Sequence, residues 1–159
     1  IKKILMIKIN VLVGNKSWKK YIKSPESYLK NKVRNLNTKI NSFKKRKLEF
    51  SLLLSENKKI KIFNNKFKKK NKVTNVLSFP SFEKKILKKL LMNKKKNIYL
   101  GDIIISLEHV LKESKFNNPK EELNKLWIHG FLHLLGERHK SHSDFKTMKR
   151  LELKYLRSL

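Results

Sequence analysis

Residues 127–139 read WIHGFLHLLGERH, an apolar segment that carries three of the five histidines in the chain. His129 and His133 are four residues apart, so in a helix they lie on the same face, one turn from each other. Gly136 can adopt a positive φ and reverse the chain, which brings His139 back toward the helix end. The segment therefore predicts one metal ion bound by these three histidines at the end of a helix.

The chemistry of three histidines favours a catalytic zinc site. Three neutral imidazoles leave the fourth position of a tetrahedral zinc ion open, as in catalytic rather than structural sites. A His-x-x-x-His pair in an apolar helix is often not a ligand pair. Here, however, three His and two Gly fall within eleven residues of a chain that has only five His and four Gly. Uncoordinated imidazoles in apolar surroundings would also lose solvation without gaining partners. We predict one Zn²⁺ per chain.

The spacing His-x-x-x-His-x-x-Gly-x-x-His also occurs in zinc proteases, where a Glu directly after the first His acts as general base. This chain has Gly130 at that position, and Glu137 lies beyond the expected helix end. Because no carboxylate stands where the protease needs one, a peptidase is disfavoured.

The helices on either side of this segment have recognisable starts. Residues 118–121 read NPKE and combine a capping Asn, a Pro at the first helical position and a Glu in the first turn. Residues 141–144 read SHSD and open a final helix. Helical spacing predicts that four of its side chains face inward: Phe145, Met148, Leu151 and Tyr155.

Four other segments have the composition of strands, namely residues 7–13, 48–55, 73–79 and 98–106. Pro80 should end the third of these, and Gly101-Asp102 should kink the fourth. Helices are expected over residues 17–43 with a break at Pro25, over 58–67 with Ile62 and Phe63 inward, over the Lys-rich residues 83–97, and over 106–116 with Ser106 as the cap. We expect an α+β fold in a single domain over residues 1–159, with a small mixed sheet of about four strands packed with helices and the zinc site at the end of a central helix.

The composition is strongly basic, with 41 Lys and Arg against 12 Asp and Glu, a formal net charge of +29. Only 5 of the basic residues are Arg, the side chain that binds phosphate at two points. The Lys excess extends over the whole chain, so nucleotide bias in the gene accounts for much of it. Whatever its origin, such a field attracts polyanions. Nucleic acid is the expected partner, and an anionic membrane surface is the second candidate.

Cysteine is absent, which excludes disulfides within the chain or with a partner and also excludes thiolate metal sites. This composition favours a cytoplasmic location. No apolar run approaches the roughly 18 residues of a membrane-spanning helix, so no membrane association through a span is expected.

Three blocks of the sequence resemble the YbeY-type endoribonucleases, which are bacterial ribosomal RNA maturation factors. HGFLHLLGERH at residues 129–139 is similar to the family's His-Gly-x-Leu-His-Leu-x-Gly-Tyr-Asp-His signature. TNVLSFP at residues 74–80 and LGDIIIS at residues 100–106 are similar to two further family blocks, and Met148 and Glu152 fit the family's closing helix. The similarity runs in the same order from about residue 51 to residue 155.

The resemblance implies a zinc ion on His129, His133 and His139 and a single-strand endoribonuclease activity. That activity would serve small-subunit ribosomal RNA maturation and ribosome quality control. The resemblance also implies that ribosomal RNA and the small ribosomal subunit are the partners. Zinc chemistry is consistent with this, because the ion lowers the pKa of bound water toward about 7 and polarises a phosphoryl oxygen.

Two departures from the family pattern bear on catalysis. Lys68 stands where the family has a functional Arg, and the resemblance implies that Lys68 is a catalytic residue contacting phosphate or the transition state; a plain solvated Lys is the alternative. Glu137-Arg138 replaces Tyr-Asp before the third histidine, and Arg cannot accept a hydrogen bond as Asp does. The alternative function is therefore a non-catalytic, ribosome-associated RNA-binding factor with a structural zinc.

Five other positions carry weaker signals. We expect His142 to be a surface residue rather than a fourth ligand and His109 to have no metal role. Asp102 should serve a turn rather than orient a ligand, and Ser78 should pack in its strand rather than bond near the site. Residues 94–96, all Lys, should form a solvated loop, with RNA contact as the alternative.

Overall fold

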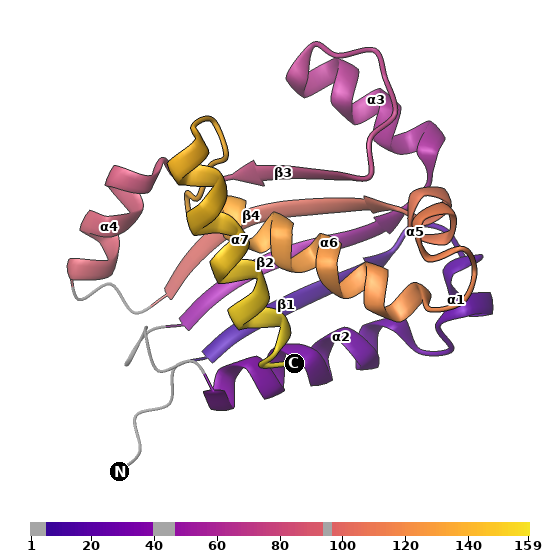
Figure 1. Cartoon of the computed structure of the whole chain (residues 1–159), viewed down its shortest axis with the longest axis horizontal. Coiled ribbons are helices and arrows are strands. Elements are labelled where there is room, and N and C mark those ends of the chain that lie inside the picture. Colours follow the sequence, from indigo (N-terminus) through magenta and orange to yellow (C-terminus); the bar gives the residue numbers. More distant parts are fainter. Residues whose placement is uncertain (1–5, 40–46, 94–96) are drawn as a thin grey trace.

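Three strands of the sheet run parallel and the fourth runs against them (Figure 1). The computed structural model describes residues 6–39, 47–93 and 97–159. The strand order is β1-β2-β4-β3, and β3 is antiparallel to β4. The strands are β1 (Met6–Val13), β2 (Lys47–Ser55), β3 (Val76–Pro80) and β4 (Asn97–Ser106). The prediction of a small mixed sheet is confirmed.

Helices supply the connections that parallel strands need, because a tight turn cannot return the chain to the same end of a sheet. The helices within the described residues are α1 (Trp18–Tyr21), α2 (Pro25–Lys39), α3 (Asn57–Lys68), α4 (Lys84–Met92), α5 (Leu107–Ser114), α6 (Pro119–Leu134) and α7 (His142–Leu156). The predicted break at Pro25 is confirmed, since α2 begins there. Residues 40–43 of that expected helix, and the lysines at 94–96, lie outside the described residues. The α+β architecture is confirmed.

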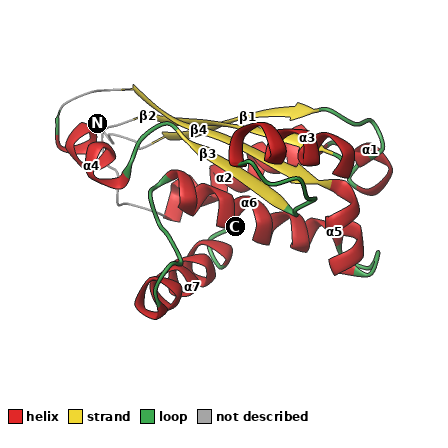
Figure 2. Ribbon diagram, turned by 90° about the horizontal axis from the view of Figure 1, so that it is seen from above, coloured by secondary structure: helices red, strands yellow, loops and turns green. Residues whose placement is uncertain are grey.

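The main core lies between one face of the sheet and α6, with α6 and α7 on the same side (Figure 2). Alternate residues of β2 point into this core, where Leu48, Phe50 and Leu52 are fully buried. The ring of Phe50 lies 5.1 Å from that of Phe131 on α6. Buried residues surround α6 toward its carboxyl end, so this is the central helix that the sequence predicts.

The other face of the sheet is partly covered by α3. Ile60 of α3 packs with Leu77 and Ile104 in a second, smaller cluster of buried side chains. Ile62 is 58% exposed, so the prediction that it faces inward is wrong, whereas Phe63 is partly buried against the small cluster. The reason is the phase of the helix: Ile60 and Asn64, four residues apart, take the inward face and turn Ile62 to solvent.

The predicted kink in β4 is a β-bulge. The pairing with β2 passes from Tyr99 opposite Glu49 to Gly101 opposite Phe50, which leaves one extra residue in β4. Gly101 has a φ of +130°, and a Cβ there would lie 2.1 Å from the carbonyl oxygen of Phe79. Gly101 therefore allows β3 to approach β4. Asp102 lies in the strand, and its Oδ1 accepts a hydrogen bond from the Tyr99 hydroxyl at 2.7 Å, so the prediction of a turn residue is wrong.

The starts of two helices account for two further differences from expectation. Ser106 precedes α5, but its hydroxyl donates to the Asn57 side chain instead of capping the helix. Phe145 is 57% exposed, whereas Met148 and Tyr155 are buried, so the inner face of α7 is used only after its first turn. Apolar spacing identifies a helix face but not where the neighbouring element ends. The caps at Asn118 and Ser141 are confirmed by side-chain hydrogen bonds.

The Lys-rich helix α4 lies at the edge of the molecule, near the chain that follows α6 (Figure 1). Leu87 is its buried side chain, whereas Met92 at its end is 81% exposed. At its start, the Lys84 ammonium pairs with the Glu137 carboxylate at 2.9 Å. The beginning of α4 is thus attached to the segment that leads to the third histidine.

Candidate metal centre

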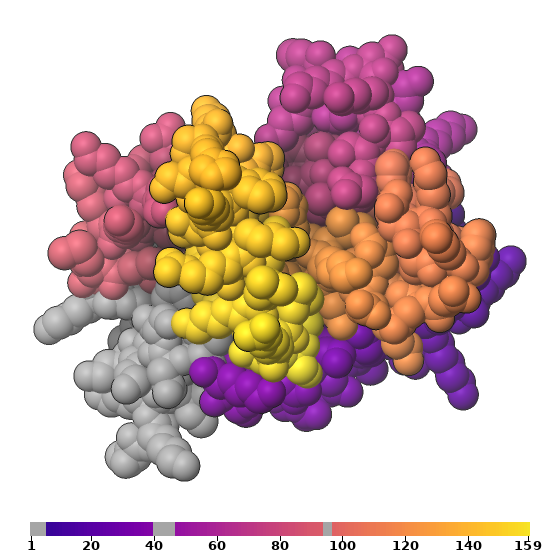
Figure 3. All heavy atoms as spheres, viewed as in Figure 1, coloured from indigo at the N-terminus to yellow at the C-terminus, as the bar shows by residue number. Residues whose placement is uncertain are grey.

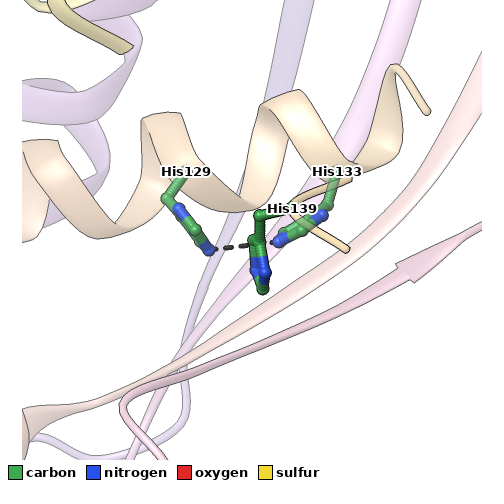
Figure 4. Close-up of side chains that lie close together, drawn as sticks. All are labelled: His129, His133 and His139. Atoms are coloured by element: carbon green, nitrogen blue, oxygen red, sulfur yellow. Dashed lines mark hydrogen bonds between the residues drawn. The ribbon is translucent and has the colours of Figure 1, made fainter. Parts of the chain in front are cut away.

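The three histidines converge at the end of α6 (Figure 4). One ring nitrogen from each of His129, His133 and His139 lies within 4.8 Å of the other two. His129 and His133 project from one face of α6 and bring their Nε2 atoms to 3.1 Å from each other. Both rings are partly buried, whereas His139 is exposed. The predicted cluster is present.

The hydrogen bonds at Nδ1 of His129 and of His133 determine which ring nitrogen carries the proton and which carries the lone pair. His129 Nδ1 lies 2.7 Å from Glu152 Oε1, and His133 Nδ1 lies 2.9 Å from the Glu137 carbonyl oxygen. Neither an ionised carboxylate nor a carbonyl can donate, so we assign the proton to Nδ1 in both rings. The two Nε2 lone pairs therefore face each other.

Two nitrogen lone pairs at 3.1 Å repel unless a cation lies beside both of them. Two imidazole nitrogens bound to the same tetrahedral zinc ion would be about 3.3 Å apart, given Zn–N bonds of about 2.0–2.1 Å. The observed spacing is close to that value, and His139 supplies a third nitrogen. The donor set therefore fits a metal ion.

Burial supports the same protonation state. Removal from water lowers the pKa of His133 from its ordinary value to about 4, with smaller contributions from the neighbouring histidines. The His133 ring is thus neutral at pH 7, as metal ligation requires.

Gly136 explains how His139 reaches the site. Its φ is +88°, and the backbone amide of Glu137 donates to the Leu132 carbonyl as the chain reverses. A Cβ at Gly136 would lie 2.9 Å from the Cα atom of Lys84, so any side chain here would collide with the start of α4. The predicted chain reversal is confirmed.

Gly130 explains why this site differs from a zinc protease. A Cβ at this position would lie 2.9 Å from Ile103 Cγ2 and 3.1 Å from Ser78 Oγ. The helix face that carries the protease Glu is therefore packed directly against β3 and β4. A carboxylate cannot be accommodated there, which argues further against a peptidase.

The histidines open into a basic groove of about 500 Å³. Figure 3 shows α3 and the segment leading into α7 as separate projections of the molecule. Basic side chains from both sides line the groove: Lys68, Lys70, Lys72 and Arg138. The structure thus brings Lys68 to the same groove as the histidines, and its ammonium lies 5.4 Å from the centre of the Phe79 ring. Its catalytic role stays a prediction.

The remaining candidates take different places. His109 and His142 are not part of the metal-binding group found among the described residues. Ser78 lines the groove, and within the described part of the chain its buried hydroxyl has no hydrogen-bond partner. Arg138 is exposed in the groove wall.

The contact between Glu152 and His129 was not predicted from the sequence. Glu152 follows Met148 by four residues and precedes Tyr155 by three, which places its carboxylate on the buried face of α7. A carboxylate on the inner face of an amphipathic helix is costly unless it has a partner. A Glu at helical spacing between two apolar residues of α7 was therefore the feature of the sequence that indicated a buried partner for Glu152.

These features define a class of protein: a small α+β protein whose three histidines, at the end of a buried helix, could hold a metal ion and face a basic groove. Residues 13–159 of the chain match the family model described as Endoribonuclease YbeY. The chain belongs to the YbeY endoribonuclease family.

Curated relatives cover nearly the whole chain. The Endoribonuclease YbeY of Pelagibacter ubique is 43% identical over 145 residues, which is 90% of each chain. That of Ehrlichia canis is 37% identical over 157 residues, covering 97% of this chain and 93% of the relative. The solution structure of TM1509 from Thermotoga maritima, 24% identical, has a TM-score of 0.56 and covers 96% of this chain and 88% of that one. This last likeness supports the fold. In the described ranges, no helix has both the length and the apolar character to cross a membrane.

Proposed function

We propose that this chain is a zinc-dependent endoribonuclease that cleaves single-stranded RNA during maturation of small-subunit ribosomal RNA. The observation that carries the proposal is the convergence of two imidazole lone pairs and a third histidine at a lysine-lined groove. Membership of the YbeY family supports RNA as the substrate. Ribosome quality control, contact with the small ribosomal subunit and a cytoplasmic location are parts of the same proposal. We also propose that a single endoribonuclease domain extends over residues 1–159.

Each wall of the groove has a distinct task in phosphodiester hydrolysis. His129, His133 and His139 would hold the zinc ion. A bound zinc ion supplies an activated water and a Lewis acid for the phosphoryl oxygen. Lys68, assisted by Arg138, neutralises the negative charge that grows on the phosphate oxygens as the bond to water forms. The remaining groove lysines hold the neighbouring phosphates of the strand and give binding a steep salt dependence.

The proposal is tested by metal analysis and cleavage of a single-stranded oligoribonucleotide, with His129→Ala compared with His142→Ala. We expect His129→Ala to lose both the metal and the cleavage. His142→Ala removes a histidine that is exposed and outside the cluster, so it should retain both. Cleavage at the wild-type rate by metal-free His129→Ala would contradict the proposed mechanism.

A second candidate is a non-catalytic RNA-binding factor whose zinc is structural. It is favoured by the contact of Lys68 with the Phe79 ring, which engages the ammonium in a cation–π interaction, and by Arg138 in place of an acceptor. This candidate predicts RNA binding that weakens steeply with salt but no cleavage with any divalent metal.

A further inference from the structure

Glu152 connects the last helix to the metal centre. Its Oε1 lies 2.7 Å from His129 Nδ1, and its side chain is only 18% exposed. The other carboxylate oxygen lies 3.9 Å from the ammonium of Lys149, one turn earlier in α7. Met148 and Tyr155, both buried, hold this face of α7 in place. The carboxylate is therefore fixed behind the first metal-binding ring.

The position of the carboxylate limits what it can do. It contacts His129 Nδ1, whereas His129 and His133 face each other with their Nε2 atoms. Glu152 is thus behind His129 and does not face the open side of the site, so it is not placed as a general base for water. A carboxylate at this position fixes the tautomer and rotation of the ring and makes Nε2 a stronger ligand.

The three histidines are supported unequally. His129 has a carboxylate acceptor, and His133 has the neutral carbonyl of Glu137. For His139, the hydrogen bonds found across the described residues include none to its ring, which is exposed. The strongest support therefore comes from α7, an element that contributes no ligand of its own.

We propose that Glu152 is a positioning residue that orients His129 for the metal ion and thereby couples the docking of α7 to metal binding. The inference rests on the metal centre of the proposed function and is independent of the RNA substrate. If a docked α7 raises metal affinity, the metal must stabilise the docking of α7 by the same factor, because coupling between two equilibria is reciprocal.

The first test measures zinc affinity by competition with a chromophoric chelator. Glu152→Ala should weaken zinc binding about 10- to 100-fold. Glu152→Gln should have a smaller effect, because its amide oxygen still accepts from Nδ1–H while the negative charge is lost. The matched control is Glu113→Gln, which makes the same change of net charge at an exposed position of α5. The absorption spectrum of the cobalt-substituted protein should change for Glu152→Ala and stay as in the wild type for the control.

The second test measures hydrogen exchange of α7 amides with and without zinc. In the wild type, zinc should slow exchange in α7 as well as at the end of α6. In Glu152→Ala, the protection of α7 by zinc should be lost while that of α6 remains. If Glu152→Ala fails to fold, the nearly isosteric Glu152→Gln is used for the same comparison.

The outcomes separate this inference from the proposed function. Zinc binding of wild-type strength in both Glu152 variants, or an equal loss in Glu113→Gln, would overturn the positioning role alone. Protection of α7 by zinc in the Glu152 variants equal to that in the wild type would overturn the coupling. A wild-type chain that binds no zinc would contradict both proposals.

Discussion

The two walls of the groove are built on different principles. One wall lies at the end of α6, a largely buried helix, and two of its imidazoles are fixed from behind by Glu152 and by the Glu137 carbonyl. The opposite wall, at the end of α3 and in the loop after it, presents exposed lysines. Asn64 organises that loop by donating to the Lys72 carbonyl at 2.8 Å. The first wall holds imidazole nitrogens in fixed positions, whereas the second presents positively charged side chains.

The difference fits the ligands proposed for the two walls. A metal ion requires nitrogen atoms within a few tenths of an ångström, whereas a phosphate is attracted by any ammonium nearby. Lys68, which the family resemblance places where an Arg is expected, lies on the second wall. Substitutions on the first wall should therefore abolish metal binding, whereas those on the second should lower the rate of RNA cleavage and leave the metal bound.

The largest effect is expected from removing a ligand on the α6 wall. His133→Ala should abolish zinc binding and reduce RNA cleavage to background, because two nitrogens cannot hold the ion in place. Metal content and cleavage rate are measured on the same preparation. A variant that retains one zinc per chain would show that His133 is not a ligand.

A smaller effect is expected on the lysine wall. Lys68→Ala should lower kcat/KM for RNA by about 10- to 100-fold, because one stabilising charge is lost. Lys68→Arg should match or exceed the wild type, and both variants should keep their zinc. Equal activity in Lys68→Ala and the wild type would assign Lys68 to the solvated surface.

The chain reversal between the walls should be sensitive to a single methyl group. Gly136→Ala should lower the free energy of unfolding by at least about 1–2 kcal/mol, because a left-handed conformation is unfavourable for residues with a Cβ. The contact of the new Cβ with the Cα atom of Lys84, at 2.9 Å, adds to this loss. The control is Gly14→Ala, whose Cβ would meet the end of the flexible Leu53 side chain. Chemical denaturation of the zinc-free proteins measures both. Equal losses in the two variants would show that neither the backbone conformation of Gly136 nor its contact with α4 is the cause.

An effect of similar size concerns the pH dependence of stability and depends on His133 of the metal-free protein. The unfolded chain protonates this side chain near its ordinary pKa of about 6.5, whereas the folded chain does so only at about 4. The unfolded state therefore binds more protons in this interval, and stability falls as the pH is lowered through it. The urea midpoint of the chelated wild type should drop more between pH 7 and pH 5 than that of His133→Asn. Parallel drops would contradict the assignment.

Local patterns were sufficient to predict the α6 wall. Histidine spacing, the Asn118 cap and Gly136 act within a few turns of one helix, so the sequence encodes them directly. The strands were also predictable, because apolar alternation is local, and only the start of β3 came later than expected, at Val76.

The features that failed depend on neighbours distant in the sequence. Ile62 and Phe145 have the apolar character of core residues, but no local pattern shows where the packing partner ends. Asp102 beside Gly101 resembles a turn, yet β3 and β2 hold it in a strand. The Glu152 contact joins residues 23 positions apart through the docking of α7.

The two ends of α4 differ in how firmly they are packed, and this difference provides a site for a probe. Its start is packed against Gly136 and paired with Glu137, whereas Met92 at the other end is almost fully exposed. Since the chain contains no cysteine, Met92→Cys would create a unique thiol for a fluorophore or spin label. A probe attached there would test whether added RNA approaches this end of α4, at a position outside the histidine cluster.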